Sequence, residues 1–151
     1  MEISRNSPRA AAYGAATWGA LFALVHAYWL FGGRLGLPAG LSVRGNLPLL
    51  IIDLVAIPLC AGAAVLALAL VRDWGRRFPR RLLLAGAWGT AALLVVHSAP
   101  SVVDWAALLL GRLHLAELDA MAYFATVLYE PFFLAGGVLF GLAALGYQRT
   151  R

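Results

Sequence analysis

Long apolar segments, separated by short polar ones, make up most of this chain of 151 residues. Four of them exceed the roughly 20 residues that a helix needs to cross the hydrocarbon core of a bilayer. None shows the polar stripe along one face that a helix of a water-soluble bundle carries. The four segments are residues 10–33, 46–71, 82–103 and 120–147.

This pattern predicts an all-α fold, an integral membrane four-helix bundle that forms one transmembrane domain over residues 1–151. Composition agrees, because only 13% of the residues are charged, whereas a water-soluble domain carries about 25%. The first apolar segment is longer than the roughly 7–15 residues of a signal-peptide core, so we interpret it as a spanning helix. The expected helices cover residues 9–33, 47–71, 81–99 and 119–147.

The arginines are distributed unevenly over the polar segments and predict an orientation. Residues 72–81 hold five of the twelve, and four more lie before the first helix or after the last: Arg5, Arg9, Arg149 and Arg151. Only three arginines fall in the other two connections. By the positive-inside rule, both termini and residues 72–81 lie in the cytoplasm. Anionic lipid then accounts for the net charge of +5, and no nucleic-acid partner is expected.

The two outer connections differ in kind. Residues 33–48 are rich in glycine and proline and predict an irregular loop. The segment 101–119 is more apolar, and its Ser101-Val-Val-Asp104 sequence resembles a capping box. We expect it to open a short interfacial helix, after which Asp119 caps the last spanning helix.

Small residues at spacings of four predict close helix packing in lipid. The last segment contains a GxxxG pair, Gly137 and Gly141, which serves either internal packing or a homodimer. The single cysteine, Cys60, excludes an internal disulfide. No CxxC or HExxH motif is present, so we expect no metal site.

The ionisable residues within the apolar segments share a depth. At 1.5 Å per helical residue, His26 and His97 lie roughly 22–24 Å above the inner surface. Asp53 lies roughly 7 Å below the outer surface, and Glu130 about 15 Å below it. The expected cytoplasmic half of the bundle contains no such group.

A carboxylate and a proline, Glu130 and Pro131, stand at the centre of the last apolar segment. Such a carboxylate costs roughly 3 kcal/mol on insertion scales, and the proline leaves the carbonyl of Val127 without its usual donor. Both are tolerable beside protein or a cavity. We therefore expect Glu130 to form the floor of an outward-facing pocket, with 33–48 and 101–119 as its roof. The expected walls are His26, Asp53 and His97, with the aromatic residues Tyr28, Trp29, Tyr123 and Tyr129 nearby.

Structural interpretations of the same residues remain open. Glu130 could be protonated and hydrogen-bonded to another helix, and Pro131 could be an ordinary kink. Asp53 is near enough to the outer surface to pair with Arg34 or Arg44. Each histidine alone could be an interhelical hydrogen-bonding residue.

Two stretches carry a family resemblance. HAYWLFGGRLGLP (26–38) and YEPFFLAGGVLFG (129–141) resemble the opening and closing signatures of small bacterial four-span membrane proteins. These are catalogued as a domain of unknown function and are common in actinobacteria. The resemblance covers essentially the whole chain and implies a plasma-membrane protein, but it brings no activity.

Several functions fit these observations. The leading hypothesis is a pocket for an amphipathic or isoprenoid-like molecule, with isomerase or cyclase chemistry that uses Glu130 as proton donor and His26 or His97 as acceptor. Burial favours the uncharged forms of both groups. A second hypothesis is b-type haem held by His26 and His97, which match in depth on different helices. The third is a non-enzymatic subunit or lipid-binding module, and a dimeric proton-coupled transporter is the fourth.

Overall fold

The computed structural model describes residues 7–149, and within this range the chain is entirely helical between its turns and loops. Four helical stretches are long and apolar enough to cross a membrane, which confirms the predicted all-helical, multi-pass class. The long helices are α1 (Ser7–Leu30), α2 (Leu47–Ala69), α3 (Arg80–Leu109) and α5 (Glu130–Arg149). The short α4 (Ala120–Phe124) continues into α5 through the π-helical turn η3 (Ala125–Tyr129).

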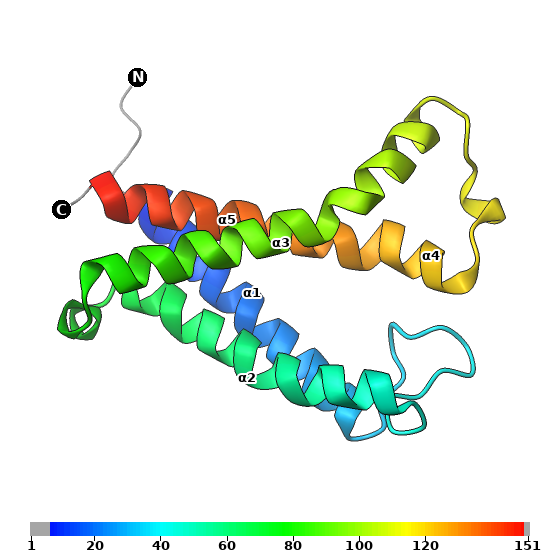
Figure 1. Ribbon diagram of the computed structural model, residues 1–151, viewed down its shortest axis with the longest axis horizontal. Helices are drawn as coiled ribbons and strands as arrows, with labels where there is room; N and C mark the ends of the chain where they lie inside the picture. Colours follow the sequence, from blue (N-terminus) through cyan, green and yellow to red (C-terminus); the bar gives the residue numbers. More distant parts are fainter. Residues whose placement is uncertain (1–6, 150–151) are drawn as a thin grey trace.

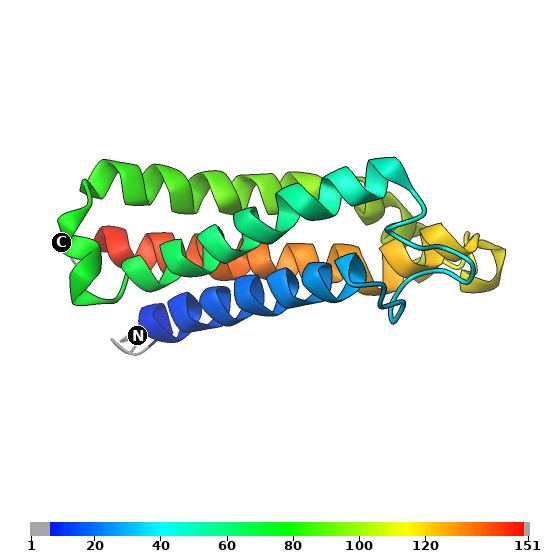
Figure 2. The same ribbon diagram turned by 90° about the horizontal axis from the view of Figure 1, so that it is seen from below.

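The chain ascends and descends so that its connections lie at two ends of the bundle (Figures 1 and 2). One end, the arginine-rich end, holds the start of α1, the end of α5 and the 3₁₀ turn η1 (Asp73–Arg77) between α2 and α3. Arg5 and Arg151 lie outside the described residues. The other end, the open end, holds residues 31–46 and 110–119. This grouping matches the predicted grouping of the connections, while the side of the membrane stays a prediction.

Close packing at the arginine-rich end depends on small side chains. Alanines of α1, α3 and α5 are almost completely buried against one another there: Ala11, Ala12, Ala87, Ala143 and Ala144. Further along, a Cβ on Gly19 would lie 2.9 Å from the backbone oxygen of Cys60. In lipid such backbone proximity drives association through van der Waals contact.

The GxxxG pair of α5 is used inside the chain. A Cβ on Gly137 would meet the side chain of Val95 at 2.8 Å, and one on Gly141 would lie 3.8 Å from Trp88. Both partners belong to α3, so internal packing explains the motif. A homodimer stays a prediction.

The four long helices separate toward the open end. Figure 1 shows α1 and α2 diverging from α3 and α5 in that direction. The helices α2 and α3 make contact near the arginine-rich end, where Leu66 packs beside Gly86. Toward the open end the bundle therefore consists of two helix pairs, α1 with α2 and α3 with α5.

Helix α3 differs from the prediction of a separate interfacial helix. It continues through Pro100 to Leu109, and Ser101 is a helical residue rather than a cap. Pro100 removes one backbone donor, but the residues on both sides keep the helical path, as happens in membrane helices packed against protein. In Figure 1 the last part of α3 turns away from α5. A 3₁₀ turn, η2 (Leu115–Glu117), follows, and the predicted Asp119 cap is confirmed by its 2.8 Å bond from the Ala122 N–H.

Candidate functional site

The helix break at Glu130-Pro131 takes the form of a π-helical turn. The N–H of Glu130 donates to the carbonyl of Ala125, five residues back, instead of to Thr126. The carbonyl of Thr126 is thereby released, and it accepts a 2.8 Å hydrogen bond from Nε1 of Trp105 on α3. Turns of this type are frequent at functional sites.

Two further side chains support the backbone around the break. Nε1 of Trp18 on α1 donates to the carbonyl of Phe132 at 2.8 Å. The hydroxyl of Ser98 on α3 lies 3.2 Å from the carbonyl of Glu130 and shares its proton with the carbonyl of Leu94. The backbone polarity at this depth is thus satisfied by protein, as the bilayer core requires.

Beside the break lies a cavity of about 630 Å³, within the roughly 300–1,000 Å³ typical of small-molecule sites. Its wall includes one ionisable pair from α1 and α2 and another from α3 and α5. We call it the acid–histidine cavity, and the four residues are His26, Asp53, His97 and Glu130. The structure therefore brings together the four side chains that sequence depth had grouped.

The first pair is buried and tightly bonded. Nδ1 of His26 lies 2.6 Å from Oδ1 of Asp53, and the two residues are 7% and 3% exposed. The second carboxyl oxygen of Asp53, Oδ2, is buried and has no hydrogen-bond partner among residues 7–149. The alternative pairing of Asp53 with an arginine is not present, and Arg44 instead donates to the carbonyl of Leu30. The Asp53 carboxylate thus orients the imidazole and keeps an acceptor free.

The second pair is looser. Nε2 of His97 lies 3.7 Å from Oε1 of Glu130, beyond a direct hydrogen bond. The Glu130 side chain is 14% exposed, whereas that of His97 is 55% exposed. Oε2 of Glu130 is also buried, and no described residue forms a hydrogen bond with it. Within residues 7–149 no three His, Cys, Asp or Glu side chains are grouped as a metal ion would require, so these groups form two separate pairs.

The predicted aromatic residues divide into two groups. Trp29 and Tyr129 line the cavity, and the Tyr129 hydroxyl donates to the carbonyl of Gly36 in the loop after α1. Tyr28 and Tyr123 do not line it and are 48% and 40% exposed. Their assignment to the pocket is corrected, because each belongs to the outer surface of its helix.

The cavity lining extends past Glu130 toward the arginine-rich end and includes aromatic rings there. Trp18, Phe22 and Phe133 line its deeper part, with Phe22 packed 5.2 Å from Phe133 between ring centroids. The prediction that Glu130 forms the floor was therefore wrong. A sequence signal was available, because Trp18, Phe22 and His26 are spaced by four and share one face of a helix.

The roof also differs from the prediction. Four apolar residues of the loop after α1 line the cavity, as expected for 33–48: Leu37, Pro38, Leu41 and Val43. The segment 101–119 contributes no lining residue. Met121 and Ala125, from α4 and η3, stand in its place because α3 continues as a helix and turns away.

One side of the acid–histidine cavity opens between α2 and α3. Leu59 on α2 and Leu93 on α3 line the cavity although they are 64% and 67% exposed. Ile52 and His97, one to two helical turns nearer the open end, also line the cavity and are also more than half exposed. These residues form the rim of a lateral opening at the level of the membrane interior.

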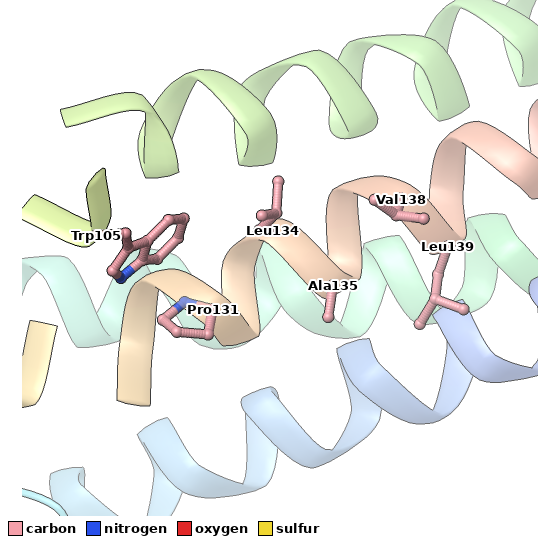
Figure 3. A pocket seen from close by; sticks show the side chains of 6 residues that line it. All are labelled: Trp105, Pro131, Leu134, Ala135, Val138 and Leu139. Atoms are coloured by element: carbon pink, nitrogen blue, oxygen red, sulfur yellow. The ribbon is translucent and has the colours of Figure 1, made fainter. Parts of the chain in front are cut away.

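A second hollow, on another surface of α5, has no comparable chemistry. Figure 3 shows it as an open apolar groove along α5 beside Trp105 of α3. The Trp105 indole nitrogen, its one polar side-chain atom, already donates to Thr126. This groove resembles an ordinary lipid-contacting surface. It is lined by Trp105, Pro131, Leu134, Ala135, Val138 and Leu139.

Comparison with known proteins identifies a family for the chain but no activity. A family model described as "Protein of unknown function (DUF3995)" matches residues 19–140. This range includes all four ionisable residues of the cavity. No curated protein and no solved structure matches the chain.

Proposed function

The chain belongs to the DUF3995 family, which brings no activity with it, and we propose that it binds an amphipathic or apolar molecule in the acid–histidine cavity. One observation carries this proposal: two acid–histidine pairs from four helices line a single cavity. Ionisable groups at this depth are expensive and mark functional sites by default.

The two pairs suit acid–base chemistry on the bound molecule. Asp53 holds His26 through Nδ1, which leaves Nε2 as the ring nitrogen for a proton acceptor. Glu130, protonated, is the donor, and His97 stands beside it. An isomerisation needs one proton delivered to the substrate and one removed from it, so this division of roles balances. Aromatic rings around the site stabilise positive charge that develops in between.

We further propose the predicted orientation, with both termini in the cytoplasm of a bacterial cell and the cavity in the outer half of the plasma membrane. Cysteine labelling in a Cys60→Ala background tests it. Ala39→Cys, at the open end, should react with an impermeant maleimide on intact cells. Phe78→Cys, at the arginine-rich end, should react only after permeabilisation, and the reverse pattern would invert the topology.

Occupancy is tested by native mass spectrometry from nanodiscs with a matched pair of variants. Ala56 lines the cavity, whereas its neighbour Val55 is 52% exposed and lies outside it. We expect a bound small molecule in the wild type and in Val55→Trp, but not in Ala56→Trp. The same adduct in Ala56→Trp, or none in the wild type, would exclude this site. A Soret band in the spectrum would instead support the haem hypothesis.

Chemistry is separated from binding by Glu130→Gln. The amide can still form hydrogen bonds, so the variant should fold and retain the adduct. If Glu130 donates a proton, the extracted molecule should differ from the wild-type mixture, because unconverted substrate accumulates. An identical mixture would favour a non-enzymatic lipid-binding role.

A further inference from the structure

We infer that the molecule bound in the acid–histidine cavity is a long-chain or polycyclic alcohol, whose hydroxyl donates to a buried carboxyl oxygen and whose body lies in the apolar part of the cavity. This inference rests on the proposed function and specifies its ligand class. It follows from the acceptors, the charges and the opening of the cavity.

Two acceptors in the cavity lack a donor. Asp53 is only 3% exposed. Its Oδ1 accepts a hydrogen bond from His26, whereas Oδ2 accepts none from any described residue. Oε2 of Glu130 also lacks a hydrogen-bond partner among the described residues, and a protonated carboxyl group still has an oxygen that accepts. A buried acceptor without a donor has lost its hydrogen bonds to water without gaining one from the protein, which is unfavourable. A ligand that supplies an O–H group removes this cost, whereas an ether or a hydrocarbon does not.

The charge balance favours a neutral donor. The lining contains no arginine, so nothing there compensates a phosphate or carboxylate. Each acid already faces a histidine, so an ammonium ion would compete with an imidazole for the same carboxyl group. An alcohol needs neither counter-charge.

The shape of the cavity accommodates an apolar body of some length. From Asp53 toward the arginine-rich end, the lining on α2 extends as far as Ala63, about 15 Å at 1.5 Å per residue. The lateral opening between Leu59 and Leu93 connects this part with the membrane interior. A lipid-soluble alcohol can therefore reach the site sideways, with its hydroxyl at the level of the two pairs.

The test uses four probes that differ only at the polar end. An 18-carbon chain bearing a diazirine is prepared as the alcohol, its methyl ether, the amine and the phosphate. Each is titrated by mole fraction into nanodiscs with the wild-type protein, and crosslinked residues are mapped by mass spectrometry. We expect the alcohol to label Leu59 and Leu93 at a mole fraction at least tenfold lower than the other probes. Ala56→Trp should lose this labelling and Val55→Trp should retain it.

The outcomes separate the two proposals. Equal labelling by alcohol and ether, or stronger labelling by amine or phosphate, overturns the alcohol inference while the cavity remains a binding site. Val65, which is exposed, serves as the background position. If none of the four probes labels Leu59 and Leu93 more strongly than Val65, both the alcohol inference and the proposed binding function are overturned. In Asp53→Asn the preference for alcohol over ether should fall to about threefold or less, and an unchanged preference would contradict the role of Oδ2. The wild-type comparison stands even if this variant does not fold.

Discussion

The two halves of this bundle differ in how closely their helices pack. At the arginine-rich end, alanines allow the helices to approach closely, and none of the described residues buried there is an acid or a histidine. Toward the open end, α1 and α2 diverge from α3 and α5, and aromatic rings and two ionisable pairs surround a cavity. The comparison teaches that side-chain size decides whether a membrane bundle closes or leaves a site, because lipid supplies no hydrophobic force to collapse the gap.

The largest loss of stability should come from forcing apart the closely packed helices α1 and α2. A leucine at Gly19 would push directly on backbone atoms of Cys60 and Ala64, which cannot rotate away. We expect Gly19→Leu to lower the free energy of unfolding by about 3 kcal/mol. Gly62→Leu, where the added side chain meets open space, is the matched control. Titration with sodium dodecyl sulfate measures both, and equal stabilities would show that the α1–α2 approach does not hold the bundle.

A smaller loss should follow from breaking the buried pair in the open half. Asp53→Ala leaves the imidazole of His26 without its 2.6 Å partner. We expect a loss of about 1–3 kcal/mol in the same titration, together with loss of the bound molecule. The control is Asp73→Ala, whose carboxylate is almost fully exposed and should change stability by less than about 0.5 kcal/mol. A wild-type stability for Asp53→Ala would mean that the pair contributes nothing to the open half.

The smallest effect concerns the support of the helix break. Trp105→Phe keeps an aromatic ring but removes the donor to the Thr126 carbonyl. The expected cost is about 1 kcal/mol, the usual contribution of one hydrogen bond. Faster amide exchange of residues 125–130 should accompany it, since the π-helical turn loses its partner. Trp88→Phe, on the same helix, should leave this exchange unchanged, and a faster exchange there would point to a general loosening of α3.

Some features of the site could be predicted from the sequence because helices convert spacing into depth. A rise of 1.5 Å per residue was enough to group four distant residues at similar levels. They line one cavity, while their chemical roles stay predictions. Tyr28 and Tyr123 were misplaced because depth does not reveal which way a side chain faces around its helix.

Length and hydropathy by themselves determined the four spanning helices, since the bilayer imposes their size and forbids unpaired backbone. The sequence also determined that a charge and a proline had to be accommodated within the last of them. Only the tertiary structure decided how this happens. In the π-helical turn, Trp105 of α3 donates the hydrogen bond that the Thr126 carbonyl would otherwise lack. The pairing of His26 with Asp53 depends on the packing of α1 against α2. Such contacts join residues far apart in the chain, and their partners follow from packing rather than from any local pattern.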